Sequence, residues 1–254
     1  MFKYLFNLGL VAFLFSCSGN SEKISLDLTP EEIDAYVANK LDSSQIYDIT
    51  RGMRFSKADT YAYSSVRFSQ NDTAILYTET EEEITGITYR NLYFKEGLPV
   101  FVEEHITKTD ASGTITIERK VYLNGAIILK ALERSAPSEE ELEAQPFKEI
   151  TMTVGQFDFE RAENSINQTD DYEMKFGEFL VVYPATYLIL DNYESGFSVA
   201  LYLSQGDELI NELYANPDAY QGRAIGLYYE FVFMNGMEQM VYAGGILSEK
   251  KKGS

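Results

Sequence analysis

Apolar and polar residues alternate along much of the chain between residues 61 and 134, and this period of two is typical of half-buried β-strands. Turn-forming pairs interrupt the alternation at Asn71-Asp72, Glu96-Gly97 and Asn124-Gly125. The last pair is the strongest hairpin signal, because both residue types tolerate a positive φ. We therefore expect an antiparallel β-meander, with a strand opening at residue 61 and others over 74–80, 87–94, 100–107, 115–123 and 126–133.

A helical period precedes these strands. Thr29 is suited to cap a helix, Pro30 to occupy its first position, and Glu32 to complete a capping box. The apolar residues that follow fall on one helical face: Ile33, Tyr36, Val37 and Leu41. The pattern predicts one amphipathic helix over residues 30–41, packed on the sheet. With the meander it forms the first domain, over residues 29–136.

An acidic stretch over residues 137–146 interrupts the alternation and is expected to be a linker between two domains. One helical turn is an alternative for it. Beyond it, over residues 147–250, the pattern predicts strands, a polar loop and one helix. The expected strands are 149–159, 178–190 with an interruption at Pro184, 197–203, 224–234 and 239–247, with the loop over 161–171 and the helix over 207–214.

Three strands, a helix and two strands follow the order of an OB barrel, although an open α+β sheet would show the same order. The segment 213–223 also resembles the helix-to-strand joint of small OB-like domains in bacterial envelope proteins. We expect a mainly β (α+β) chain, with the meander followed by an OB-like, five-stranded, partly open barrel.

The beginning of the chain has a different character. Lys3 precedes a run from residue 4 to 15 in which Asn7 is the one polar residue, and this run is too short to span a bilayer. Leu14 and Ser16 then precede Cys17, and this arrangement resembles the lipobox of bacterial lipoproteins. The resemblance implies removal of a signal peptide (1–16), lipid attachment at Cys17 and a tether over residues 17–28. An ordinary secretory signal cleaved nearby is the alternative.

Composition limits the partners and the compartment. Lys and Arg number 21 against 40 Asp and Glu, so the net charge is −19, which repels nucleic acid, and we expect no nucleic-acid partner. The single cysteine allows no disulfide within the chain, so stability must come from a core. Tyr and Phe number 19 and 16, and this abundance favours strands.

The sequence contains no recognisable catalytic constellation. The one histidine, His105, lies in an expected strand and is interpreted as an ordinary sheet residue. Carboxylates such as Asp158 with Glu160, or Asp170 with Asp171, are too numerous for any pair to indicate catalysis. We assign no catalytic residue, no metal ligand and no cofactor.

Four tyrosines could stack on a ligand, although core packing is the simpler interpretation of each. They are Tyr61, Tyr63, Tyr228 and Tyr229. We expect a lipid-anchored envelope protein that contacts the membrane through its lipid and acts as a binding or scaffolding module for a protein or glycan. Ser18 after the cysteine fits outer-membrane sorting, as the lipobox resemblance implies, with the periplasmic side preferred. The alternatives are a carboxylate-dependent glycan hydrolase and an inhibitor or immunity-type protein with an acidic binding face.

Overall fold

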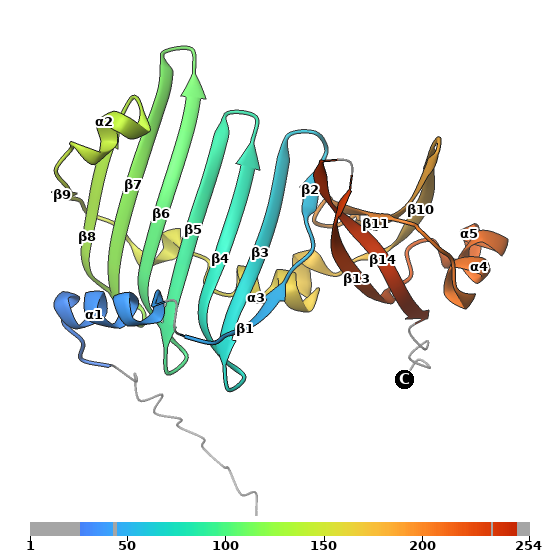
Figure 1. Cartoon of the computed structure of the whole chain (residues 1–254), viewed down its shortest axis with the longest axis horizontal. Helices are drawn as coiled ribbons and strands as arrows, with labels where there is room; N and C mark the ends of the chain where they lie inside the picture. Colours follow the sequence, from blue (N-terminus) through green and yellow to red (C-terminus); the bar gives the residue numbers. More distant parts are fainter. Residues whose placement is uncertain (1–25, 43–44, 235, 248–254) are drawn as a thin grey trace, which may run out of the picture.

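The computed structural model describes residues 26–42, 45–234 and 236–247 (Figure 1). Strands dominate these residues and form one open, mixed, 14-stranded sheet, so the expected mainly β class is confirmed. The strands are β1 (Asp48–Arg51), β2 (Phe55–Lys57), β3 (Tyr61–Gln70), β4 (Thr73–Glu83), β5 (Gly86–Lys95), β6 (Leu98–Asp110), β7 (Gly113–Asn124), β8 (Ile127–Ala136), β9 (Lys148–Glu149), β10 (Lys175–Val182), β11 (Ala185–Asn192), β12 (Phe197–Tyr202), β13 (Ile225–Met234) and β14 (Met237–Leu247). The α-helices are α1 (Pro30–Lys40), α2 (Glu139–Glu143), α3 (Arg161–Asn167), α4 (Glu208–Ala215) and α5 (Pro217–Tyr220).

The strands from β3 to β8 pair antiparallel, each with the next along the chain. α1 packs on one face of this large sheet near the end where β5 turns into β6 (Figure 1). Its predicted capping box is present, with Glu32 N donating to the Thr29 hydroxyl and Thr29 N to the Glu32 carboxylate. Ile33 and Val37 are buried there against aromatic side chains of the sheet: Tyr93, Phe101 and Tyr122.

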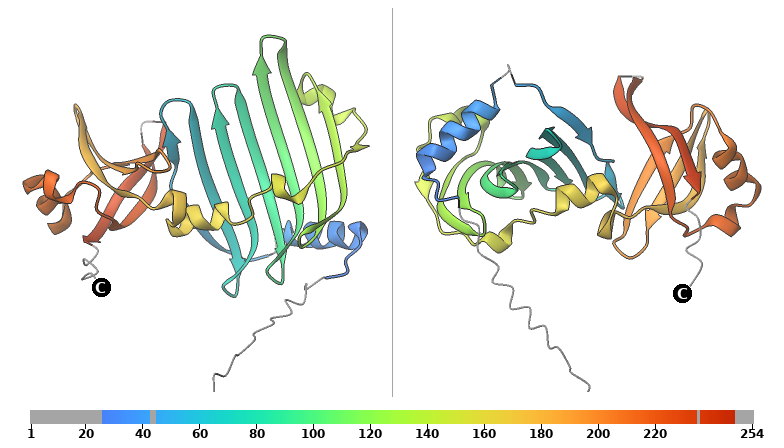
Figure 2. Two further views of the ribbon diagram at one scale, coloured as in Figure 1. Left: turned by 180° about the vertical axis from the view of Figure 1, so that it is seen from behind. Right: turned by 90° about the horizontal axis from the view of Figure 1, so that it is seen from below.

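The opposite face is covered by a segment that we call the strap, residues 150–167, which runs across the strands (Figure 2). Phe157 and Ala162 of the strap pack on an apolar row of the sheet. Members of that row are paired across neighbouring strands: Tyr77, Leu92, Val102, Val121 and Ala131.

The strap corrects two of the sequence predictions. The expected strand 149–159 pairs with the sheet only at Lys148–Glu149, and the expected loop 161–171 contains the helix α3. Ile150 N still donates to the Ala131 carbonyl of β8 at 3.0 Å, but Met152 and Val154 lie beyond this pairing and pack on the face of the sheet. Alternation reports one-sided burial, which an extended segment crossing a sheet shares with a paired strand.

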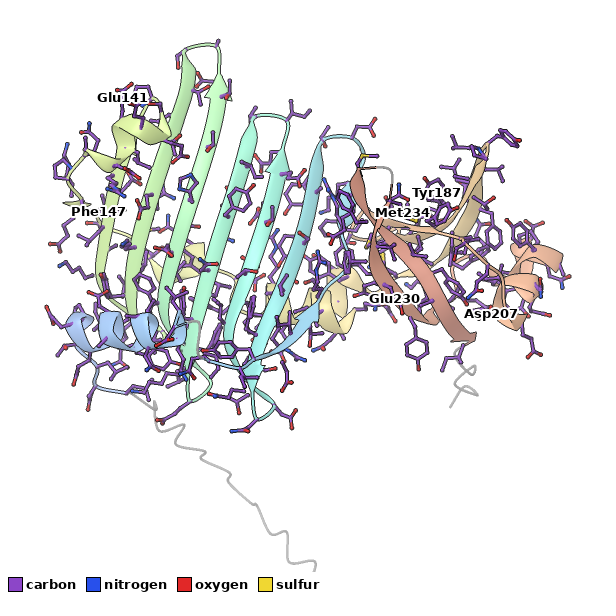
Figure 3. All side chains as sticks on the ribbon, viewed as in Figure 1. Glu141, Phe147, Tyr187, Asp207, Glu230 and Met234 are labelled. Carbon is purple, nitrogen blue, oxygen red and sulfur yellow. The ribbon has the colours of Figure 1, made fainter. Side chains whose placement is uncertain are left out.

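The expected acidic linker contains the short helix α2, capped by the Ser138 side chain, which accepts from Glu141 N. Leu142 of this helix is buried. Figure 3 shows Glu141 on α2 and Phe147 beyond it, at the outer edge of the large sheet. The Phe147 ring lies under the cations of Lys120 and Arg134, at 5.1 and 4.7 Å from its centroid. These contacts attach the segment to β7 and β8.

The remaining strands form a smaller, strongly twisted part of the same sheet. β10, β11 and β12 pair antiparallel, β13 and β14 form a hairpin, and Tyr202 of β12 pairs parallel with Val241 of β14. An isolated antiparallel bridge joins Lys175 to Ala224. Ser198 of β12 pairs with Ser56 of β2, so the two parts of the sheet are continuous. No helix among the described residues is long and apolar enough to cross a membrane.

Candidate functional site at the junction of the two parts

A row of alternating charges crosses the strap-covered face of the large sheet. Five residues on successive strands are aligned by the hairpin registers, and we call them the charge ladder: Glu79, Arg90, Glu104, Arg119 and Glu133. Arg90 donates to Glu79 and Glu104, each at 2.8 Å, and Arg119 donates to Glu133 at 2.6 Å. Opposite charges placed directly across strands stabilise the pairing, and here they also neutralise carboxylates that the strap excludes from water.

The ladder is deeply buried near its centre. The Glu79 and Glu104 side chains are 1% and 4% exposed, and the Arg90 side chain is 15% exposed. The second Glu79 oxygen accepts from the Tyr63 hydroxyl at 2.6 Å, so both of its oxygens are used. A buried carboxylate is tolerated only when paired and hydrogen-bonded in this way.

Arg161 of the strap extends the ladder toward the smaller part of the sheet. Its guanidinium lies 2.7 Å from a Glu81 oxygen that also accepts from Arg90 at 3.0 Å. It donates to the Tyr172 hydroxyl at 3.1 Å and also to the Tyr61 hydroxyl. The same cation stacks on the Tyr63 ring, 3.9 Å from its centroid. One strap side chain therefore joins β3, β4 and the segment leading to β10.

The electrostatics of this cluster favour its charged form. Burial alone would raise the pKa of Glu81, but Arg161 and then Arg90 outweigh it and hold that pKa below its ordinary value. Burial and the neighbouring Glu79 raise the pKa of the Tyr63 hydroxyl, which therefore stays protonated and donates. Glu81 is thus an anion held by two cations.

A pocket of about 470 Å³ opens beside Arg161, between the strap and the smaller part of the sheet. We call it the junction pocket, and its lining combines aromatic rings with side chains of both charges: Lys57, Thr60, Tyr61, Asp158, Arg161, Asn164, Asp170, Asp171, Tyr172 and Phe197. The Tyr172 and Phe197 rings are stacked, with centroids 5.0 Å apart. Lys57 lies over the Phe197 ring, at 4.2 Å. Apolar ring surface beside convergent hydrogen-bonding groups is the usual make-up of a small-ligand site.

Two of the four candidate tyrosines lie at this junction. Tyr61 lines the pocket, and its hydroxyl donates to Glu81 at 3.3 Å. Tyr63, two residues along the same strand face, is fully buried and is a core residue covered by Arg161. The structure therefore brings Tyr61 and Tyr63 together but leaves only Tyr61 accessible to a ligand.

The other two lie apart from the pocket, on β13. Tyr228 is 65% exposed, and the half-buried Tyr229 donates its hydroxyl to the Arg51 carbonyl at 2.8 Å. His105 lies on the α1-bearing face of the large sheet, with its Nε2 2.6 Å from a Glu139 oxygen of α2. Cys17 lies outside the described residues.

Arg161 and Phe197 were missed by sequence reasoning, and the three pocket aspartates were noticed only as members of a large acidic set. Arg161 is 80 positions from Glu81, and Phe197 begins a strand with no distinguishing neighbour. The one local signal is that Arg161 and Lys57 are cations in a strongly acidic chain.

A scan against protein-family models, a search of curated proteins and a search of solved structures found no match to this chain. The site is therefore interpreted from its geometry alone.

The ladder makes a testable prediction about stability. Arg90→Met should lower the free energy of unfolding by about 3 kcal/mol or more, because it leaves buried carboxylates unpaired. Arg54→Met breaks the exposed pair between Arg54 and Glu82, whose side chains are 54% and 43% exposed. It should lower the free energy of unfolding by about 1 kcal/mol or less. Urea unfolding of the two variants and the parent measures both values.

A compensated variant separates charge from packing. Adding Glu79→Gln and Glu104→Gln to Arg90→Met should restore part of the lost stability, because the unpaired charges are removed. Equal, small losses in Arg90→Met and Arg54→Met would contradict the ladder's role.

Proposed function

We propose that this chain is a lipid-anchored binding protein of the bacterial cell envelope, and that the junction pocket holds its ligand. The pocket is the observation that carries the proposal, because it sets the partly exposed ring of Tyr61 beside carboxylate, amide and cationic groups. A saccharide has C–H faces that pack on aromatic rings and hydroxyls that bond to such groups. A glycan is therefore the ligand class that fits the lining best.

The proposed OB-like barrel is consistent with this assignment. Three features support such a barrel: the spatial strand order β10, β11, β12, β14, β13, the parallel Tyr202–Val241 pair and the Lys175–Ala224 bridge. Along the chain, α4 lies between β12 and β13, the third and fourth strands. OB-folds include oligosaccharide binders. The fold alone assigns no ligand, so the proposal rests on the pocket.

The anchor is proposed from the lipobox resemblance around Cys17, with attachment to the outer membrane on its periplasmic side. Several acyl chains would hold the protein stably at a bilayer.

A hydrolase is the competing function, because three carboxylates line the pocket: Asp158, Asp170 and Asp171. The Asp158 carboxylate accepts from the backbone N–H groups of Glu160 and Arg161, each at 3.1 Å, and so supports the start of α3. Burial and then Glu178 raise the pKa of Asp191, but Asp191 lies on β11 and does not line the pocket. These two observations favour binding over acid–base catalysis.

The anchor predicts the mass of the native amino-terminal peptide. It should begin at Cys17 and carry acyl chains, as intact-mass spectrometry of protein extracted from its own membranes would measure. An unmodified peptide beginning elsewhere would exclude the anchor and leave the pocket assignment standing.

The pocket predicts a charge-specific effect on glycan binding. We would measure calorimetric binding to a peptidoglycan disaccharide, an N-acetylglucosamine tetramer and a glucose tetramer. Asp171→Asn should weaken binding by about tenfold, since a hydrogen bond to a charged group contributes roughly 1.5–3 kcal/mol. Glu173→Gln is the matched control. This substitution removes the same charge two residues away, and Glu173 does not line the pocket.

The outcomes separate the competing functions. Binding without cleavage supports the proposal, and release of shorter products from any of the three glycans supports the hydrolase. Absence of binding to all three, or an equal loss in both variants, would contradict the glycan site.

A further inference from the structure

The hairpin that joins β10 to β11 ends in an exposed apolar tip. Four consecutive residues are exposed there: Leu180 (45%), Val181 (66%), Val182 (56%) and Tyr183 (95%). A single exposed apolar side chain is ordinary on a protein surface, but four in succession at the end of a projecting hairpin are not. Because the tip projects, it cannot enclose a small ligand and is suited to entering another phase or partner.

The tip also interrupts an otherwise charged chain. Residues 179–187, which lie outside the fully buried end of β11, include no Lys, Arg, Asp or Glu, whereas charged residues make up 24% of the chain. About two charges would be expected in a run of nine at that frequency. An uncharged run of this kind lowers the cost of leaving water for an apolar phase.

A second hairpin of the smaller sheet part adds apolar surface. Phe233 and Met237, beside the turn between β13 and β14, are 75% and 62% exposed. Figures 1 and 2 show this hairpin and the β10–β11 hairpin ending at the same end of the smaller part. In Figure 3 Met234 marks the β13–β14 hairpin, and Tyr187 lies along the β10–β11 hairpin. Two separate apolar hairpin ends on the same side of the protein are better suited to contact an extended partner surface than to occupy a single groove in a partner.

We propose that the β10–β11 tip inserts into the interfacial region of a lipid bilayer with zwitterionic headgroups. The aliphatic side chains of Leu180, Val181 and Val182 would enter the acyl region, and Tyr183 has the ring and hydroxyl that suit the headgroup boundary. The net charge of −19 disfavours an anionic surface and selects the zwitterionic one.

Access to the bilayer rests on the anchor proposed above. The nine residues from Cys17 to Ser25 span at most about 30 Å, so an acylated chain keeps its folded part beside the membrane. Tethering of this kind raises the local concentration of bilayer that the tip meets. Insertion itself depends on the tip alone, and the experiment isolates it.

The test places a fluorescent probe at the tip and at a control position. Cys17→Ser removes the one native cysteine of the full chain, and either Tyr183→Cys or Ala126→Cys adds a thiol for an environment-sensitive dye. Ala126 is an exposed residue of the turn between β7 and β8, beside Asn124, whose side chain accepts from Leu26 N at 2.9 Å. The control therefore lies on the large sheet part, away from the β10–β11 tip, and reports vesicle contacts that do not involve the tip (Figure 1).

With phosphatidylcholine vesicles, the dye at position 183 should shift its emission to the blue and be quenched by lipids brominated on their acyl chains. The dye at position 126 should do neither. Adding Val181→Asp should weaken the response at position 183 at least about tenfold, because a charge in the bilayer costs more than 1.4 kcal/mol. Far-UV circular dichroism confirms that these exposed substitutions leave the fold intact.

Three results would overturn the proposal. The dyes at positions 183 and 126 could respond equally, or the dye at position 183 could remain in water with vesicles present. A blue shift without lipid that grows with protein concentration would instead identify a second copy of this chain as the occupant. Because the labelled chains lack the acylated cysteine, failure of insertion is distinguishable from failure of the anchor.

Discussion

The ion pairs between Glu81, Arg90 and Arg161 are the contacts on which the arrangement of this protein depends. Arg90 belongs to the sheet and Arg161 to the strap, and both donate to the same Glu81 oxygen, at 3.0 and 2.7 Å. That shared oxygen connects the charge ladder to the segment that leads into the smaller sheet part. If the strap moved, Glu81 would lose one of its two cations, the Tyr61 hydroxyl would lose Arg161, and the junction pocket would lose one wall.

Apolar packing and charge pairing have different effects on the strap. Phe157 and Ala162 pack on the apolar row of the sheet, which holds the strap down without fixing its position along the strands. The Arg161 contacts are directional and set that position, and a hydrogen bond of 2.6 Å between Ser65 and Ser165 adds a further point. Removing two charges from water offsets much of their attraction, so these pairs add little net stability although breaking one of them is costly.

The first half could be predicted well from the sequence because its information is local. The capping residues Thr29 and Glu32 mark α1, and alternation bounded by turn residues marks each long strand. The strap could not, because the alternation of Ile150, Met152 and Val154 reports a buried side without saying whether the backbone is paired. The rest of the pocket depends on contacts between distant positions.

The candidate tyrosines show the same limit. Tyr61 and Tyr63 share a strand face, so their proximity follows from the period of two. Which of them is open to a ligand is decided by Arg161, and that arginine reaches them from a helix one hundred positions away along the chain. Burial by a distant segment leaves no mark in the sequence around Tyr63.

Amide hydrogen exchange in Arg161→Met tests most directly whether the shared ion pairs hold the strap and the junction together. The account predicts faster exchange in α3 and in residues 170–172, while amides at the centre of β6 and β7 keep their parent rates, because those strands are paired on both sides. Unchanged exchange in α3, or a uniform acceleration across the whole chain, would contradict it.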